Sequence, residues 1–266
     1  YHISHRAKNV DVYLLWGELL SNLYIESGDQ SKFHIITGYT GSHYLDNFFK
    51  ESKVFFEGDK SPVMSIYDTS VYDDLFVNKE EMLSFVCQIS EYALARGVNV
   101  IIKTKRHNEL YSNLIKKYPN SIAISDQLSS LSAGMRSNLV VGYLMSTPVL
   151  LLGSYKRNVV FFDPYKICWD KYYDCFSDCI EREMKGIFSR IKEVATDKRV
   201  DASNSDCSEF QLVNRFNDAN YQKKVSEYIN SILKSKHEDK KLVLLESNIS
   251  YQKKYGLDLI KEKDGY

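Results

Sequence analysis

The sequence predicts an α/β protein in which a Rossmann-like parallel sheet carries helices on both faces. Short apolar runs alternate with segments of helical period from residue 10 to residue 163. The runs are continuous rather than alternating in polarity, as expected of strands that are buried on both faces. Alternation of this kind indicates β-α-β units, which place neighbouring strands in parallel.

The first elements lie in residues 10–56. The run 10–16 (VDVYLLW) stands between Asn9 and Gly17 and predicts a strand. Helical spacing follows over 17–27 and ends at Gly28. We expect a second strand at 33–36, a short helix at 43–53 and a short strand at 54–56.

The next unit opens with the strand 63–67 (VMSIY), which ends at Asp68. Asn78 predicts the N-cap of a helix over 79–96, because acidic residues follow in the first turn and Gly97 stands at its end. We then expect strands at 98–102, 121–124, 139–142 and 159–163, and helices at 108–118, 128–135 and 147–152.

The regular alternation ends at Pro164. Beyond it the sequence predicts helices at about 179–193 and at 217–233, and a charged tail from 234 to 266. The chain opens at Tyr1 without a methionine, so we expect it to be part of a longer protein.

Composition excludes several classes of protein. The 35 basic and 35 acidic side chains leave no net charge, so bulk electrostatics do not favour nucleic-acid binding. No apolar run approaches the roughly 20 residues of a membrane-spanning helix. The five cysteines, an odd number, predict reduced thiols in a cytoplasm. Cys175 and Cys179 have the spacing of half a zinc site, but no second pair follows, so we expect no metal.

The segment 140–149 (VVGYLMSTPV) predicts an anion site. A buried strand ends at Gly142, and Pro148 has the backbone geometry of a first helical residue. Ser146 or Thr147 is then the N-cap, beside unpaired backbone N–H groups at the positive end of the helix dipole. The alternative is that these hydroxyls only cap a buried helix.

A basic segment follows the strand 98–102. Lys103, Lys105 and Arg106 stand at the edge of the sheet where Ser146 is expected, and such side chains can offset phosphate charge. The alternative is a solvated basic turn. Asp68 and Asp163 also follow strands, and each could accept from a sugar hydroxyl or cap a turn. The sequence has no P-loop, no dinucleotide-binding glycine pattern and no nucleophile elbow.

These segments resemble the C-terminal domain of bacterial surface-polysaccharide glycosyltransferases of the GT-B fold. The group whose hallmark is a Pro-Phe-Thr-Ser-type motif is the most similar, with 143–148 (YLMSTP) in place of the motif and 158–164 (NVVFFDP) as the closing strand. The basic segment 103–106 is also similar in position to the phosphate-contacting motif of Kdo- and sialyltransferase-like enzymes that use CMP-linked sugars. Here Tyr, Leu and Met replace the hallmark's Pro and Phe, which leaves the donor open.

The resemblance implies a metal-independent glycosyltransferase that needs no cofactor and moves a sugar from a nucleotide donor, of CMP type, to a bacterial surface polysaccharide. It implies that Lys103, Lys105, Arg106, Ser146 and Thr147 contact the donor phosphate. It further implies sugar, ribose or base contacts at Thr69, Ser125, Asp126, Tyr143 and Asp163, with Asp68 as the candidate catalytic residue.

The implied division of the chain is 1–58 as the end of an N-terminal domain or a linker, 59–236 as the nucleotide-sugar-binding domain and 237–266 as the charged tail. The expected partners are the donor and a glycan acceptor, with a cytoplasmic location and peripheral membrane association through a lipid-linked acceptor. Two alternatives stay open: a polyol-phosphate transferase of the teichoic-acid type, and an inactive nucleotide-binding or scaffold module. His107 is followed by Asn108 rather than by proline, which counts against the first of these.

Overall fold

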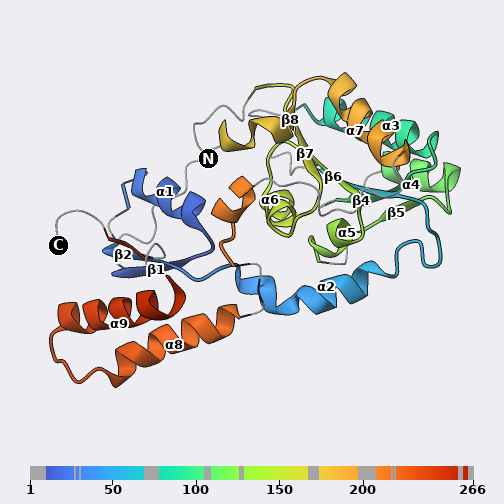
Figure 1. The fold of residues 1–266 in the computed structure, drawn as a ribbon. Coiled ribbons are helices and arrows are strands. Elements are labelled where there is room, and N and C mark those ends of the chain that lie inside the picture. Colours follow the sequence, from blue (N-terminus) through green and yellow to red (C-terminus); the bar gives the residue numbers. More distant parts are fainter. Residues whose placement is uncertain are drawn as a thin grey trace. The chain divides into compact units, whose positions relative to one another are not determined.

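The computed structural model divides the chain into two compact units (Figure 1). It describes residues 10–26, 28–29, 31–68, 78–104, 109–125, 129–166, 174–196, 208–216, 218, 220–256 and 260–262. The larger unit is Asp46–Phe210, and the smaller one combines Tyr1–Leu45 with Gln211–Tyr266. The predicted boundaries at 58 and 236 differ from this division, because the two ends of the chain fold together.

The larger unit is built on a six-stranded sheet in the order β5-β4-β3-β6-β7-β8, with every neighbouring pair parallel. The strands are β3 (Val63–Tyr67), β4 (Asn99–Lys103), β5 (Ile122–Ile124), β6 (Leu139–Tyr143), β7 (Val159–Phe162) and β8 (Ile180–Glu181). The helices are α2 (Leu45–Ser52), which begins at the boundary, α3 (Lys79–Leu94), α4 (Glu109–Lys117), α5 (Ser132–Met135), α6 (Thr147–Ser154) and α7 (Met184–Thr196). The expected parallel α/β fold is therefore confirmed.

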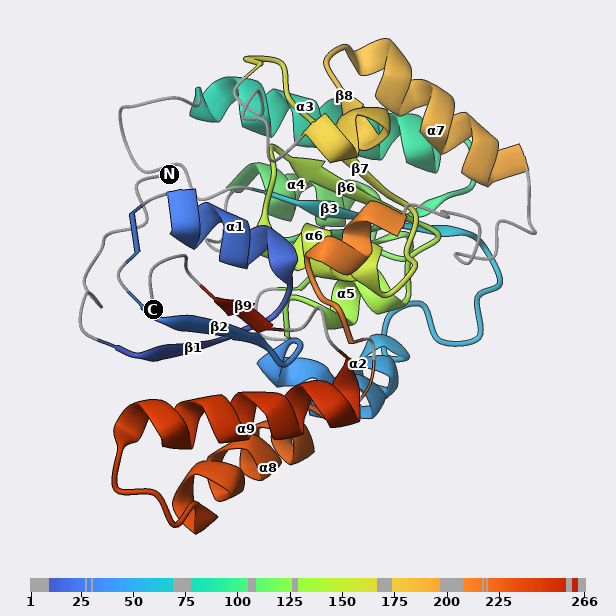
Figure 2. The same ribbon diagram turned by 60° about the vertical axis from the view of Figure 1, so that its left-hand side comes forward.

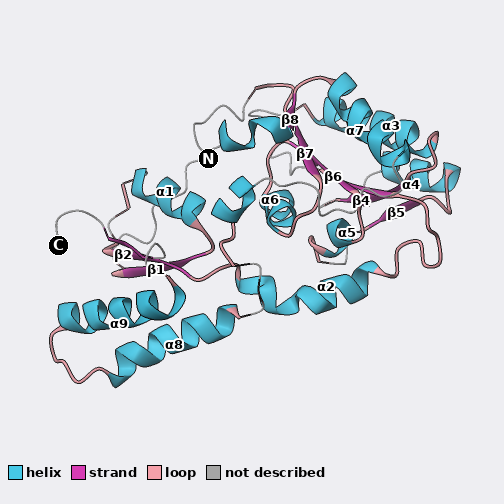
Figure 3. Ribbon diagram, in the orientation of Figure 1, coloured by secondary structure: helices cyan, strands magenta, loops and turns pink. Residues whose placement is uncertain are grey.

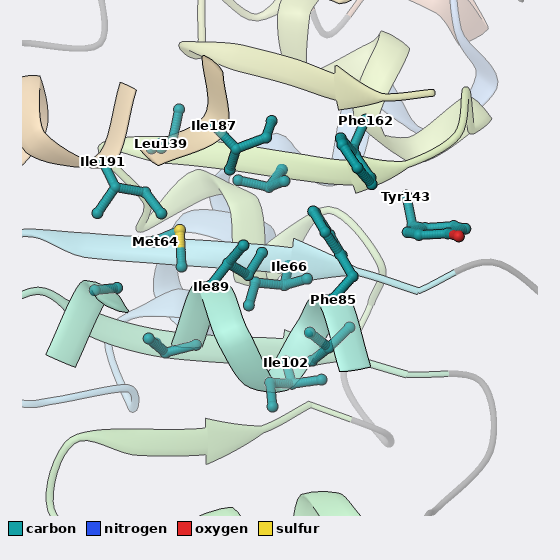
Figure 4. Close-up of a cluster of buried hydrophobic side chains, with 14 of the residues drawn as sticks. Met64, Ile66, Phe85, Ile89, Ile102, Leu139, Tyr143, Phe162, Ile187 and Ile191 are labelled. Atoms are coloured by element: carbon teal, nitrogen blue, oxygen red, sulfur yellow. The ribbon is translucent and has the colours of Figure 1, made fainter. Parts of the chain in front are cut away.

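Helices cover both faces of this sheet, as the colouring by secondary structure in Figure 3 shows. Helices α3, α4 and α7 lie on one face, and α5 and α6 lie on the other (Figure 1). Side chains alternate between the two faces along each strand. Met64, Ile66, Ile102, Leu139 and Phe162 therefore meet Phe85 and Ile89 of α3 and Ile187 and Ile191 of α7 in one core (Figure 4).

The smaller unit contains a three-stranded sheet, β1-β2-β9. β1 (Val12–Leu15) and β2 (Phe33–Ile36) are parallel, and β9 (Ile260–Glu262) pairs with β2 in the antiparallel direction. Its helices are α1 (Glu18–Glu26), α8 (Tyr221–Lys234) and α9 (Lys240–Tyr255). Figure 2 shows α8 and α9 side by side as a helical hairpin.

The expected charged tail is wrong as a structural description. Leu244 and Tyr251 of α9 are buried against Phe33, Ile35 and Ile36 of β2, and the chain then adds β9 to the sheet. Because the apolar positions of α9 are widely spaced among lysines, its hydrophobic side is weakly marked in the sequence, and only the packed partner strand reveals it.

Two other local expectations are also corrected. Residues 54–56 form a turn rather than a strand, because their amides continue the end of α2: Val54 N donates to the carbonyl of Glu51 and Phe55 N to that of Ser52. The predicted helix 179–193 is displaced, since Cys179 ends a 3₁₀ helix and α7 begins at Met184. The strand β8 occupies the residues between them.

Candidate functional site

The strand order of the larger unit defines where a ligand is expected. Numbered from its first strand, the order is 3-2-1-4-5-6, the order of doubly wound nucleotide-binding sheets. The order reverses between β3 and β6, which lie side by side with Tyr67 opposite Gly142. In open α/β sheets, ligands bind outside the carboxyl ends of the strands at this reversal. The segments after Tyr67 and after Tyr143 therefore flank the candidate site.

The helix that follows β3 is α3, and its N-terminus is capped by a side chain and carries acidic residues. The side-chain oxygen of Asn78 accepts from the backbone N–H groups of Glu80, at 2.9 Å, and of Glu81, at 3.3 Å. Both glutamates lie in the first turn of α3. Their negative charge and the occupied cap disfavour an anion at this helix end.

The helix that follows β6 has the opposite character. Ser146 is the N-cap of α6 in an extended conformation, but its side chain makes no capping hydrogen bond, and no acidic residue lies in the first turn. The Ser146 hydroxyl oxygen is buried and has no hydrogen-bond partner among the described residues. Thr147 is exposed at the first helical position, and Pro148 follows it. Of the two helix ends beside the reversal, α6 is the one that suits an anion.

The turn into α6 is strained and tightly packed. Leu144 has a φ of 60°, a left-handed conformation that costs a non-glycine residue about 1 kcal/mol or more. Its N–H donates to the carbonyl of Phe162 at 2.8 Å, which holds the turn against β7. At Gly142 an added Cβ would lie 3.2 Å from Phe161 and 3.3 Å from Val149, so the glycine lets α6 approach β6 closely. The hydrogen bond to β7 and the close packing at Gly142 thus fix the backbone of the turn that leads to Ser146.

The basic segment lies at the same edge of the sheet as Ser146. Lys103 is the last residue of β4 and stands opposite Tyr67, which stands opposite Gly142 on its other side. Two strand spacings separate the backbones of Lys103 and Gly142, or roughly 10 Å. Lys105 and Arg106 lie outside the described residues. The two segments predicted to hold phosphate therefore share one edge, as far as the described part of the chain extends.

Asp68 accepts hydrogen bonds from a residue at the end of β4 and from a residue of α4. Its Oδ2 accepts from the hydroxyl of Thr104 at 2.6 Å and from that of Tyr111 at 3.3 Å. Burial is the main reason that the pKa of Tyr111 is raised, and the neighbouring Asp68 carboxylate adds to the effect. The contacts tie the ends of β3, β4 and α4 together. Thr69 lies outside the described residues.

Three other predicted contact residues are buried. Ser125 follows β5, and its buried hydroxyl has no partner among the described residues, whereas Asp126 lies outside them. Asp163 is fully buried after β7, where its N–H donates to the carbonyl of Glu181 at 2.9 Å. Tyr143 packs its ring on Phe85 of α3 (Figure 4), and burial raises the pKa of its hydroxyl. In this structure Tyr143 and Asp163 do not present their side chains to solvent.

A chain of hydroxyl groups links β6 to the start of α3, and the sequence did not reveal it. Tyr143 Oη donates to Tyr165 Oη at 3.2 Å, and Tyr165 Oη donates to Glu81 Oε2 at 2.5 Å. The N–H of Asn78 also donates to Tyr165 Oη, at 3.2 Å. Tyr165 follows an Asp-Pro turn, and nothing in its sequence context predicts this role.

An open cavity of about 540 Å³ lies farther along the same edge, between β8 and the start of α7. Asp174, Glu181, Arg182, Glu183 and Lys185 contribute its charged side chains. Within the described residues no group of three His, Cys, Asp or Glu side chains could hold a metal ion. No helix in the described part of the chain is long and apolar enough to cross a bilayer.

No family model matches this chain, and no curated protein sequence matches it either. Solved structures do match. The wall teichoic acid polymerase TagF, in one variant form, is 15% identical with a TM-score of 0.58, over 86% of this chain and 60% of the polymerase chain. A TagF variant soaked with CDPG is 14% identical with a TM-score of 0.55, over 86% of this chain and 58% of that one.

Two other solved structures are similar as well. The S. aureus MnaA structure with UDP is 10% identical, with a TM-score of 0.53 over 84% of this chain and 61% of that chain. A putative UDP-N-acetylglucosamine 2-epimerase from Listeria monocytogenes is 11% identical, with a TM-score of 0.51 over 86% and 75%. The chain spans 60% of the polymerase it matches. At such identities the likeness shows the fold alone, and the chain has a GT-B-like α/β fold.

Proposed function

We propose that this chain contains the donor-binding unit of a glycosyltransferase that uses a nucleotide-activated sugar. The observation that carries the proposal is the N-terminus of α6. There, a buried hydroxyl without a partner, an exposed threonine and uncapped backbone N–H groups stand at the reversal point of a nucleotide-binding type of sheet.

The chemistry requires that negative charge be stabilised on a leaving phosphate. The bond between the anomeric carbon and the phosphate oxygen breaks, the acceptor hydroxyl bonds to that carbon, and its proton passes to a base. The N–H groups of Thr147 and Val149 and the hydroxyls of Ser146 and Thr147 would donate to the phosphate. Lys103, Lys105 and Arg106 would offset its charge. Such preorganised donors stabilise the transition state without a metal ion.

The finer assignment is a CMP-linked donor and a bacterial surface glycan as the acceptor, reached at the membrane from the cytoplasmic side through a lipid-linked end. Asp68, Thr69, Ser125, Asp126, Tyr143 and Asp163 would surround the sugar, ribose or base. The side chains of Ser125, Tyr143 and Asp163 and the hydroxyl of Ser146 are buried, so their contact with the donor requires a rearrangement when it binds. Its support is the resemblance in position of the basic segment 103–106 to the phosphate-contacting motif of transferases that use CMP-linked sugars.

A second candidate is transfer of a polyol phosphate, favoured by the likeness to a wall teichoic acid polymerase and to its variant soaked with CDPG. In that reaction an oxygen–phosphorus bond of CDP-glycerol breaks, and the acceptor hydroxyl takes the glycerol phosphate. Both reactions release CMP. An α6 site that holds the phosphate of CMP therefore serves either of them.

Calorimetry with CMP and UDP, followed by CMP-release assays with a CMP-sugar and with CDP-glycerol, tests the proposal on the full chain. We expect CMP to bind and a CMP-sugar to release it when an acceptor glycan is added. Release from CDP-glycerol alone would replace the first candidate with the second. CMP binding without release from either donor would identify a binding module, and the failure of both nucleotides to bind would overturn all three functions.

A further inference from the structure

The helical hairpin α8–α9 presents apolar side chains to solvent beside its turn. Leu233, one residue before the end of α8, is 75% exposed, and Leu242, in the first turn of α9, is 47% exposed. Ile229 and Ile249 are also exposed, so these two helices hold four of the eleven exposed large hydrophobic residues in the described part of the chain. Single exposed leucines are ordinary, but a pair that flanks one turn is a feature of the hairpin.

These side chains are not needed by the core of the smaller unit. The inward positions of the hairpin are Tyr228, Leu244 and Tyr251, which pack beneath β2. The hydroxyl of Tyr228 donates to Asn248 at 2.8 Å, and that of Tyr251 donates to the carbonyl of Ile36 at 2.9 Å. One side of the hairpin thus packs on the sheet of the smaller unit, and Leu233 and Leu242 lie on the exposed side.

The turn between the helices is held by side-chain hydrogen bonds. Oε2 of Glu246 accepts from the Ser235 hydroxyl at 2.9 Å and lies 3.8 Å from Nε2 of His237. Asp239 caps α9 by accepting from the N–H of Lys241 at 2.7 Å. Because these bonds order the turn between Leu233 and Leu242, little backbone ordering is needed when the hairpin contacts a partner.

The hairpin has more basic than acidic side chains. Residues 221–255 contain eight lysines and four acidic residues, although the whole chain has no net charge. Ion pairs within the unit join Lys224 to Asp218, Lys240 to Asp11 and Lys254 to Glu227. The other five are exposed: Lys234, Lys236 and Lys241 lie within three residues of Leu233 or Leu242, whereas Lys223 lies near the start of α8 and Lys253 near the end of α9.

We propose that the α8–α9 hairpin docks on an anionic lipid surface, with Leu233 and Leu242 entering the headgroup layer and the lysines beside them contacting lipid phosphates. Protruding apolar side chains flanked by lysines are what such an interface accepts. A second copy of this chain is a poorer occupant, because pairing two hairpins would bring their excess lysines together. The docking does not depend on the donor site of the larger unit.

Co-sedimentation of the full chain with vesicles tests the docking. We expect binding to phosphatidylcholine vesicles that contain about 30% phosphatidylglycerol, and much weaker binding to phosphatidylcholine alone or at high salt. Replacing both leucines (L233S/L242S) should lower the partition coefficient about tenfold or more. Replacing two exposed lysines (K234Q/K236Q) should lower it by a similar factor.

The larger unit supplies matched controls. Val54 is 66% exposed, and Lys53 and Lys60 are exposed near it, so V54S and K53Q/K60Q make the same chemical changes away from the hairpin. Both controls should sediment as the parent chain does, and thermal unfolding should be unchanged in all four variants. Equal binding of hairpin and control variants, or no preference for anionic vesicles, would overturn the proposal. Dissociation of a dimer by L233S/L242S, without vesicle binding, would assign the surface to a second copy instead.

Discussion

The hydroxyl of Thr104 donates a 2.6 Å hydrogen bond to Oδ2 of Asp68, and this contact joins the carboxyl ends of β3 and β4. Thr104 is buried, and Asp68 begins the segment that faces the candidate site. Because this carboxylate oxygen is shared with Tyr111, its position is defined by two neighbours before any ligand binds.

The first prediction concerns this contact. A double-mutant cycle of Thr104→Val and Asp68→Ala, measured by urea unfolding, should give a coupling energy of about 1.5–3 kcal/mol, as for hydrogen bonds to charged groups. Thr104→Val and Tyr111→Phe, each made alone and then together, separate the contributions of the two hydroxyl donors to the free energy of unfolding. Additive effects of Thr104→Val and Asp68→Ala would show that the bond contributes nothing to stability.

The second prediction tests the anion site at α6. Ser146→Ala combined with Thr147→Val should weaken CMP binding by about 1.5–3 kcal/mol, which calorimetry measures as a roughly ten- to 150-fold higher Kd. The Ser146 hydroxyl has no partner among the described residues, so its removal should not lower stability. An affinity within about twofold of the parent chain would refute the site.

Asn78→Ala is the matched control for that pair, since Asn78 caps the other helix beside the reversal point. Its side chain accepts from two backbone N–H groups, so its loss should lower the free energy of unfolding by about 1 kcal/mol. CMP affinity should stay the same. Weaker nucleotide binding in this variant would place the anion at α3 rather than at α6.

The third prediction follows from the direction of the hydrogen bonds at Tyr165. Tyr165→Phe removes the acceptor of the buried Tyr143 hydroxyl, whereas Tyr143→Phe removes only the donor. A buried hydroxyl without a partner costs about 1–3 kcal/mol, so Tyr165→Phe should be the more destabilising single change. The double variant should regain part of that loss. Equal effects in thermal unfolding would contradict this hydrogen-bond order.

The fourth prediction concerns acid stability in the smaller unit. Oδ2 of Asp29 accepts from the backbone N–H of Ser31 and lies 2.9 Å from Nε2 of His34. Burial alone would raise the pKa of Asp29, but hydrogen bonds from Ser31 and His34 outweigh it, so the pKa is lowered. The resulting stability is fully present above the unfolded-state pKa of about 3.9 and is lost as the pH falls through the lower folded value.

Asp29→Asn should therefore flatten the decline in the free energy of unfolding below about pH 4. Urea unfolding at a series of pH values measures this decline. Glu238→Gln, which removes an exposed carboxyl group of the same unit, serves as the control. If the free energy of unfolding falls equally steeply below pH 4 in the parent chain and in Asp29→Asn, the contacts of Asp29 do not contribute to the acid dependence of stability.

The local residue pattern predicted strands and helices correctly where capping residues or glycines mark their ends. The run 63–67, the Asn78 cap and the Gly97 stop predicted β3 and α3 to within two residues, because burial and capping act on neighbouring residues. The turn at 54–56 and the start of α7 were wrong, since short apolar runs fit a helical turn and a strand equally well. The helix α9 was missed because its partner strand β2 lies about two hundred residues away in sequence.

The sequence by itself determined that the sheet is parallel, that helices cover it on both faces and that a helix begins at Ser146 or Thr147 at its carboxyl edge. Apolar runs and capping residues encode these features within a few positions. Only the tertiary structure decided the strand order, the joining of the two chain ends in one unit, the burial of Tyr143 and the lack of a side-chain cap on α6. Those features depend on contacts between segments that are far apart in the sequence, and the free energy of such contacts cannot be predicted from a local pattern of residues.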